Sequence, residues 1–229
     1  MLLLALDTST ATVTVALHDG NRVLFERTDR DAGHAVELLA PLVAEGLAAT
    51  GTHRTDLTAV TCGVGPGPFT ALRVGLMTAG TLAHSLGIPS HGVCSLDVLA
   101  AGAVRQGTAP PGEFLVATDA RRREVYWARY AGQGARLAGP AVGRAANVPR
   151  DGLPVVGFGA VLYPEALGPP LEPREPSAAD LAELTVQALS VQAPTRPALT
   201  GDAGLLPLRP LYLRRPDAVV PAARKRVLP

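Results

Sequence analysis

The feature that most constrains the fold is a pattern that occurs twice in the 229-residue chain. In each copy, a short apolar run ends in an aspartate, and a polar turn then leads into a second strand-like run. The first copy covers residues 2–6 and ends at Asp7, and the second covers residues 113–118 and ends at Asp119. A weak internal repeat of this kind predicts two similar units, each built around a sheet.

Strand-like and helical patterns alternate around both copies. Apolar residues with helical spacing predict helices at residues 35–49, 69–86, 96–104 and 178–189. Alternating or β-branched runs predict further strands at residues 12–17, 22–27, 57–62, 88–93, 124–130, 154–158 and 211–213. This alternation predicts an α/β fold with mixed sheets, arranged as two lobes with a cleft between them.

The Gly- and Pro-containing residues 106–112 are the candidate boundary between the lobes. We expect an N-terminal lobe at 1–105, a smaller C-terminal lobe at 106–200, and a C-terminal segment with a basic tail at 201–229. Ser177 is the expected N-cap of the last helix. Little order is expected from residue 216 onward.

The composition limits which cellular compartment and which class of partner are expected. No run of about 18 apolar residues predicts a membrane span, and residues 1–6 have no basic flank like that of a signal peptide. Cys62 and Cys94 lie far apart in apolar contexts, which favours buried free thiols in a reducing compartment. We therefore expect a cytoplasmic protein. The formal net charge of +1 does not favour a dedicated nucleic-acid binder.

The two strand-end carboxylates are the first candidate site. Asp7 is followed by Thr8 and Ser9, and Asp119 occupies the matching position in the second half. Carboxylates with neighbouring hydroxyls can hold Mg²⁺ and hydrogen-bond a phosphate. The same residue types also simply form turns, so both interpretations stay open.

A loop at residues 63–68, Gly-Val-Gly-Pro-Gly-Pro, lies between a predicted strand and a predicted helix. Backbone amides at such a position can bind an anion. However, the loop lacks the lysine of a P-loop, and its two prolines donate no hydrogen bond. A rigid connection is therefore the first interpretation, and a phosphate cradle the second.

Small side chains recur every four residues along the helix after this loop, at Ala71, Gly75, Ala79 and Ala83. A stripe of this kind lets another helix approach closely. Val36, Leu39 and Val43 form an apolar stripe on the preceding helix. From the residues alone, packing within the chain and a partner interface are equally supported.

The five histidines show neither HxxxH nor HExxH, and the chain contains no GxSxG. These absences weigh against a metallohydrolase and a serine hydrolase.

Several motifs taken together resemble the TsaB family, formerly called YeaZ. They are LDTS at 6–9, GVxSL at 92–96 and YLR at 212–214, together with two longer ones. The first longer motif, GxGPGxFTxxRxG, contains Gly65, Gly67, Phe69 and Arg73. The second, DARxxEVY, contains Arg121, Glu124 and Tyr126.

The resemblance implies a two-lobed actin-like fold (ASKHA, ribonuclease H-like) with a reduced second lobe. It implies a non-catalytic role in forming threonylcarbamoyladenosine (t6A) at position 37 of tRNAs that read codons starting with A. The implied partners are the catalytic paralogue TsaD, the ATPase TsaE and, through the complex, tRNA. The implied heterodimer interface is formed by the helices at 35–49 and 69–86. That favours a partner surface for Val36, Leu39, Val43, Ala71, Gly75, Ala79 and Ala83.

The resemblance implies no cofactor of the chain's own, with ATP or ADP and Mg²⁺ expected in the assembled complex. The same helix face could also pair two copies of this chain. Residues 94–99 lack the HxxxH that holds metal in the catalytic paralogue. Pro68 and Ala71 replace a Ser and a Gly of the family loop.

The main alternative function is an ATP-dependent phosphotransferase of the same fold that uses Asp7 and Asp119. A metallopeptidase is disfavoured by the missing ligands. Residues 121–123 and the basic tail are a hypothesis for tRNA contact within the complex.

Overall fold

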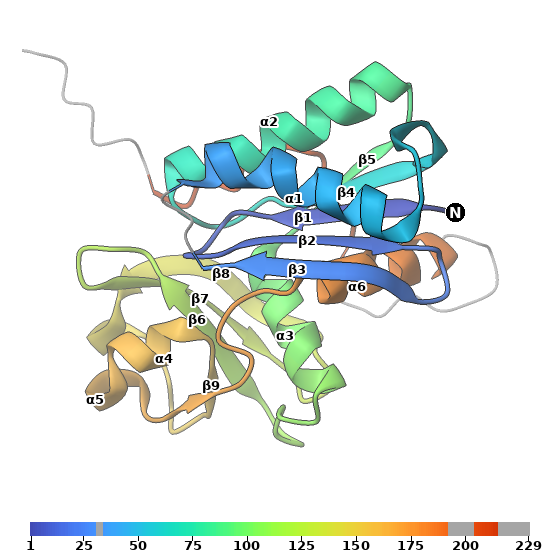
Figure 1. The fold of residues 1–229 in the computed structure, drawn as a ribbon. Helices are drawn as coiled ribbons and strands as arrows, with labels where there is room; N and C mark the ends of the chain where they lie inside the picture. The colour runs from blue at the N-terminus through green and yellow to red at the C-terminus, as the bar shows by residue number, and fades with distance from the viewer. Residues whose placement is uncertain (31–33, 192–203, 215–229) are drawn as a thin grey trace, which may run out of the picture.

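The computed structural model describes residues 1–30, 34–191 and 204–214 and shows two stacked lobes, each built on a five-stranded sheet (Figure 1). The first sheet has the order β3-β2-β1-β4-β5. Its strands are β1 (Leu3–Asp7), β2 (Val13–His18), β3 (Val23–Asp29), β4 (Ala59–Gly63) and β5 (Ser90–Val93). The second sheet has the order β10-β9-β6-β7-β8. Its strands are β6 (Phe114–Asp119), β7 (Glu124–Tyr130), β8 (Arg136–Arg144), β9 (Val155–Val156) and β10 (Pro170–Leu171).

The two sheets have the same topology, which confirms the repeat predicted from the sequence. In the first sheet, β1 pairs antiparallel with β2 and parallel with β4. In the second, β6 pairs antiparallel with β7 and parallel with β9. The strand-end aspartates Asp7 and Asp119 therefore occupy equivalent positions in the two lobes.

Helices cover both faces of the first sheet. Helices α1 (Ala35–Thr50) and α2 (Phe69–Leu86) lie on its upper face, and α6 (Ala178–Val191) lies on the lower face (Figure 1). Within β1, Leu4 and Leu6 pack with the upper helices, whereas Leu3 and Ala5 pack with α6. Every residue of β1 is buried for this reason. Gly51 and Gly87 end α1 and α2 in left-handed conformations.

Two helices each pack against the sheet that lies on the other side of residues 106–112 in sequence. Helix α3 (Ser95–Arg105) packs through Leu96 and Leu99 into the core of the second sheet, although it precedes residues 106–112 in sequence. Helix α6 follows the second sheet in sequence but packs on the first. A division at residues 106–112 therefore separates each helix from much of the core that it completes. The boundaries 1–105, 106–200 and 201–229 stay a prediction.

Three details differ from the sequence expectations. Strand β8 was not predicted, because its Ala, Gly and Pro residues have low strand propensity. The short helices α4 (Phe158–Leu162) and α5 (Pro164–Leu167) and the two-residue strand β10 were not predicted either. The strand predicted at residues 211–213 is wrong, because the segment has no regular structure there and forms a single bridge at Leu206 with Gly92.

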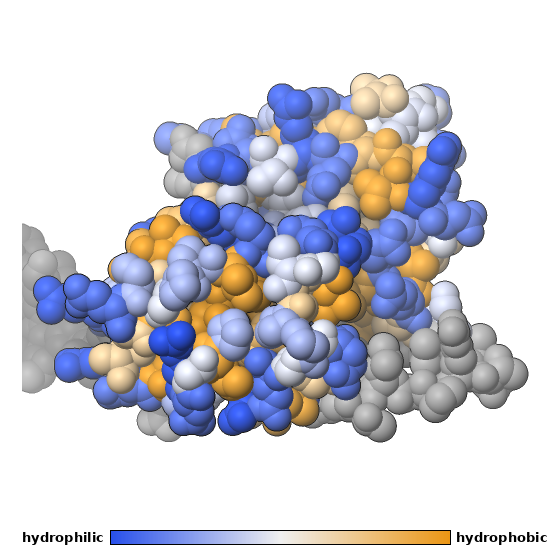
Figure 2. Space-filling view, turned by 90° about the horizontal axis from the view of Figure 1, so that it is seen from below, coloured by the Kyte–Doolittle hydropathy of each residue, from blue (hydrophilic) through white to orange (hydrophobic). Residues whose placement is uncertain are grey.

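Ser177 accepts a hydrogen bond from the amide of Asp180 at 3.2 Å, which confirms the predicted N-cap of α6. The expected disorder from residue 216 lies outside the described residues. Within the described part of the chain, no helix combines the length and the apolar character needed to cross a membrane. The lower face of the molecule shows scattered apolar patches among hydrophilic residues (Figure 2).

Candidate functional site

The longest family-like motifs, far apart in sequence, meet at one cavity of about 430 Å³ between the lobes. The loop before α2 forms one wall, and the turn between β6 and β7 forms another. The segment 211–214 closes a third side. The lining residues are Gly67, Pro68, Phe69, Asp119, Ala120, Arg121, Arg122, Tyr126, Leu211, Tyr212, Leu213 and Arg214.

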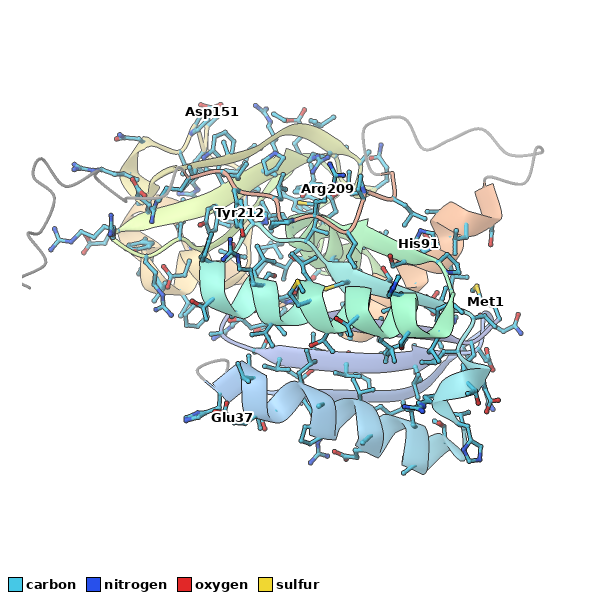
Figure 3. The ribbon with its side chains drawn as sticks, turned by 90° about the horizontal axis from the view of Figure 1, so that it is seen from above. Met1, Glu37, His91, Asp151, Arg209 and Tyr212 are labelled. Atoms are coloured by element: carbon cyan, nitrogen blue, oxygen red, sulfur yellow. The ribbon has the colours of Figure 1, made fainter. Side chains whose placement is uncertain are left out.

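An aromatic contact fastens the C-terminal segment to the start of α2. The rings of Phe69 and Tyr212 stack with centroids 5.1 Å apart. The Arg73 guanidinium lies 3.7 Å from the centre of the Phe69 ring, and its Nε donates a hydrogen bond to the Tyr212 hydroxyl at 2.9 Å. Tyr212 lies beside the first turns of α2 when the molecule is seen from above (Figure 3).

The loop at residues 63–68 is tightly packed rather than open. A Cβ on Gly67 would lie 2.1 Å from the Ser9 carbonyl oxygen, and Gly65 adopts φ +91°. The amide of Ser95 donates to the Gly65 carbonyl at 2.8 Å, and the amide of Val64 donates to the Val93 carbonyl at 2.9 Å. These contacts favour the rigid connection over a phosphate cradle.

The turn between β6 and β7 has an unusual backbone. Arg121, Arg122 and Arg123 have φ values of 61°, 56° and 63°, so three consecutive non-glycine residues are left-handed. This conformation costs about 1–2 kcal/mol per residue. The Asp119 carboxylate accepts the Arg121 amide hydrogen at 2.7 Å, and the Arg121 carbonyl accepts the Glu124 amide hydrogen at 2.9 Å.

Two ion pairs lie at the wall of the cavity. Asp119 contacts the Arg121 guanidinium at 3.1 Å, and Glu124 pairs with Arg214, which joins the C-terminal segment to the second lobe. Burial and the nearby Asp119 raise the pKa of the Tyr126 phenol, so it stays neutral. The motif residues therefore build the walls of a shared cavity.

The other strand-end carboxylate, Asp7, does not line this cavity. Its side chain is fully buried, and its Oδ1 and Oδ2 accept hydrogen bonds from the Ser9 amide at 2.6 Å and the Ser95 hydroxyl at 2.7 Å. A Cβ on Gly63 would lie 1.9 Å from Oδ2. Burial raises the pKa of Asp7 despite these hydrogen bonds.

Thr8 is likewise engaged within the chain. Its hydroxyl donates to the Ala71 carbonyl at 2.6 Å and accepts from the Gly75 amide at 3.2 Å. Thr8 and Ser9 are both buried. Asp7, Thr8 and Ser9 therefore do not fit a magnesium–phosphate site in this conformation, because both Asp7 oxygens are occupied by protein donors. Among the described residues, no group of three His, Cys, Asp or Glu side chains could hold a metal ion.

Glu175 is a partly buried carboxylate that the sequence did not single out. Burial raises its pKa most, and both Asp7 and Asp119 raise it further, which places Glu175 within reach of both carboxylates. Its position in a Gly- and Pro-rich stretch gave no periodic signal that could have identified it.

The structure corrects the predicted partner interface. Leu39, Gly75, Ala79 and Ala83 are buried against the sheet of their own chain, so the prediction that they contact a partner is wrong. Small side chains were needed because α2 lies close to the sheet: a Cβ on Gly75 would lie 2.5 Å from the Thr8 hydroxyl.

The remaining predicted interface residues keep exposed surface. Val36 is 67% exposed, whereas Ala71 and Val43 are half-buried. Val36, Ala71 and Val74 line a groove of about 380 Å³ between the beginnings of α1 and α2. Their contact with a partner stays a prediction.

The duplicated sheets, the helices on both faces and the cavity between the lobes define an actin-like two-lobed protein. The family model described as "TsaD: tRNA N6-adenosine threonylcarbamoyltransferase" matches residues 30–157. The structure of YeaZ from Pseudomonas aeruginosa superposes with a TM-score of 0.70 and 31% identity, covering 83% of this chain and 93% of that one. The chain belongs to the TsaB (YeaZ) family of the TsaD superfamily.

Relatives differ in how much of their length is matched. An uncharacterised protein of Mycobacterium bovis is 46% identical over 94% of this chain and 92% of its own length. An uncharacterised Mycobacterium leprae protein is 45% identical over 95% of this chain, which spans only 56% of that relative. The Escherichia coli protein named tRNA threonylcarbamoyladenosine biosynthesis protein TsaB is 42% identical over 57% of this chain and 55% of its own length.

Proposed function

We propose that this protein is a non-catalytic subunit of the machinery that forms threonylcarbamoyladenosine at position 37 of tRNAs that read codons starting with A. It acts by pairing with a TsaD-like catalytic paralogue through the exposed side of α1 and α2, and a TsaE-like ATPase joins the pair. ATP or ADP and Mg²⁺ act in that complex. The names of the TsaB relatives and the match to the TsaD family model support this proposal.

The observation that carries the proposal is the apolar surface on one side of the molecule. Eight large hydrophobic side chains are exposed among the described residues. Four of them belong to α1, α2 and the adjoining C-terminal segment: Val36, Phe69, Met77 and Tyr212. These elements lie side by side on the upper face (Figure 3). Apolar side chains gathered on one face are typical of a protein–protein contact.

We call this surface the α1–α2 face and define it by Val36, Val74 and Met77. Val36 and Met77 are each 67% exposed, and Val36 and Val74 share the groove between the two helices. Both helices are anchored to the sheet by their opposite sides, so the face is presented on a rigid support. We expect the same face to allow pairing of two copies when the paralogue is absent.

The site chemistry favours a supporting role over the phosphotransferase alternative. A phosphotransferase of this fold would need the Asp7 carboxylate for its metal, yet both Asp7 oxygens are hydrogen-bonded inside the lobe. The segment 94–99 also lacks the HxxxH motif that holds metal in the catalytic paralogue.

The test is complex formation with the TsaD-like paralogue from the same organism, measured by size-exclusion chromatography with light scattering. We expect a 1:1 complex for the wild type. Met77→Glu and Val36→Glu should weaken it at least tenfold, because a charge would be buried in an apolar contact. Both residues are exposed in the free chain, so these variants should fold normally.

Leu137→Glu is the matched control, because Leu137 is 51% exposed but lies on β8 of the other lobe. It should leave the complex and its t6A-forming activity unchanged. The proposal fails if the wild type forms no complex, or if all three variants behave alike.

A further inference from the structure

We infer that an arginine patch on the second lobe contacts the phosphate backbone of RNA, and that the tRNA of the proposed function is this RNA. The inference rests on that proposed function. The patch consists of five residues from three chain segments: Arg121, Arg122 and Arg123 in the β6–β7 turn, Arg144 at the end of β8, and Arg214 in the C-terminal segment.

Tertiary structure brings these segments together around Glu124. Arg144 is the cross-strand neighbour of Glu124 in the β7–β8 ladder. Arg214 forms an ion pair with the same carboxylate. The Arg123 carbonyl accepts a hydrogen bond from the Ala145 amide, which fixes the turn beside the end of β8.

The patch is rich in positive charge. Its three segments carry five guanidinium groups and two carboxylates, Asp119 and Glu124, and Glu175 lies within electrostatic reach of Asp119. The two carboxylates are engaged by Arg121 and Arg214, and these ion pairs hold the inner part of the patch in place. Arg122, Arg123 and Arg144 are exposed. An excess of charge at a surface attracts a polyanion over several ångströms.

The hydrogen-bonded turn fixes the backbone of Arg121, Arg122 and Arg123. Three consecutive left-handed residues are unfavourable, and the hydrogen bonds to Asp119 and Glu124 stabilise them. A guanidinium group binds two phosphate oxygens at once through parallel N–H donors. A rigid row of such groups suits successive phosphates along one strand.

The surroundings favour RNA over a small anion. Arg121, Arg122 and Arg214 line the interlobe cavity, whereas the exposed Arg123 and Arg144 do not, so the patch extends beyond that one pocket. Arg121 lines both the interlobe cavity and the groove of the α1–α2 face. An RNA strand lying on the patch would therefore run next to the bound paralogue.

The experiment uses a full-length transcript of a tRNA that reads codons starting with A. It measures how this tRNA binds to the complex of this chain with the catalytic paralogue. Fluorescence anisotropy gives the affinity over a range of salt concentrations. The double variant Arg122→Asn, Arg123→Asn removes two charges, and asparagine tolerates the left-handed backbone. The slope of log K against log salt should become less steep by about 1–2, because each lost phosphate contact removes about 1.

The matched control is Arg22→Asn, Arg54→Asn. It removes the same charge beside the hairpin and the 3₁₀ turn at the opposite end of the first sheet, where β1 begins. It should leave the slope unchanged. Complex formation, measured by light scattering, should be the same for all three proteins.

The outcomes separate the two proposals. If the wild-type complex forms and binds tRNA but the Arg122/Arg123 variant keeps the full slope, only the arginine patch is refuted. If that variant loses binding of inorganic phosphate while its tRNA slope is unchanged, the patch holds a small anion and the inference is equally wrong. If no complex forms or the complex binds no tRNA, both proposals fall.

Discussion

At the scale of single residues, Asp7 shows how a strand-end carboxylate can serve the fold rather than a ligand. Its position is equivalent to that of Asp119, but the two environments differ. Asp7 lies under Gly63 and accepts hydrogen bonds from Ser9 and Ser95, whereas the side chain of Asp119 is 22% exposed at the cavity. The charge of Asp7 is therefore stabilised by protein donors while burial opposes it.

Asp7→Asn should change how stability depends on pH. The pKa of Asp7 is raised above its ordinary value of 3.8, so the folded state binds the proton more tightly than the unfolded state. The contribution of Asp7 to stability is therefore largest below pH 3.8 and falls as the pH rises through the raised pKa. Asparagine keeps a hydrogen bond to each neighbour without titrating. Urea unfolding should show the variant gaining stability relative to wild type as the pH rises towards 7.

A constant difference between the two proteins over that pH range would contradict this account. Asp7 also raises the pKa values of Cys62 and Glu175, so both pKa values should fall in the variant.

At the scale of elements, the loop at residues 63–68 and helix α2 act as one unit that joins the lobes. The loop packs under the Ser9 carbonyl, and α2 lies on the sheet through Gly75 and Ala79. The start of α2 then stacks Phe69 on Tyr212. Gly67 is required because it meets the backbone of Ser9, and Gly75 because it meets the Thr8 side chain.

Gly67→Ala should destabilise the protein by about 3 kcal/mol, because the added Cβ would overlap a backbone oxygen that cannot rotate away. Gly112→Ala is the matched control. Its Cβ would meet nothing within 4 Å, so stability should stay the same or rise by about 0.5 kcal/mol. Denaturant unfolding of both variants gives the comparison. Equal stabilities would show that the loop adapts and is not rigid.

At the scale of the whole molecule, the contacts of α3 and α6 link the two lobes, so we expect the lobes to unfold as one cooperative unit. Arg105 of α3 forms an ion pair with Asp180 of α6, whose side chain is 2% exposed. Asp97 of α3 accepts a hydrogen bond from Tyr130 at 2.7 Å and pairs with Arg136 at 3.3 Å. Each helix thus completes a core that its neighbours in sequence do not supply.

Arg105→Met should lower the free energy of unfolding by about 2 kcal/mol, because Asp180 would be left as a buried charge without its partner. The loss is smaller than for a fully buried pair, since the Arg105 side chain is 55% exposed. Asp180→Asn in the same chain should restore most of it. Trp127 fluorescence and far-UV circular dichroism should report one shared transition, whereas two separate transitions would contradict the coupling.

The sequence supported the elements more reliably than the contacts between them. The duplicated strand pattern predicted the two sheets, because hydrophobic periodicity is a local property that each strand carries. Strand β8 escaped prediction because its pairing with β7, rather than its own composition, makes it a strand. Leu39, Gly75, Ala79 and Ala83 were wrongly assigned to a partner interface, because a stripe of small or apolar residues looks the same in sequence whether it faces a sheet or another protein.

The sequence by itself determined the α/β class, the repeat, the turn and cap residues and the family motifs. The tertiary structure alone decided that Asp7 is buried and that Glu175 lies near Asp7 and Asp119. It also decided that α3 packs on the second sheet and α6 on the first. It also gathered five arginines from three segments around Glu124. Burial, pKa and charge density depend on which distant segments pack together, and that information is not local to any one stretch of the chain.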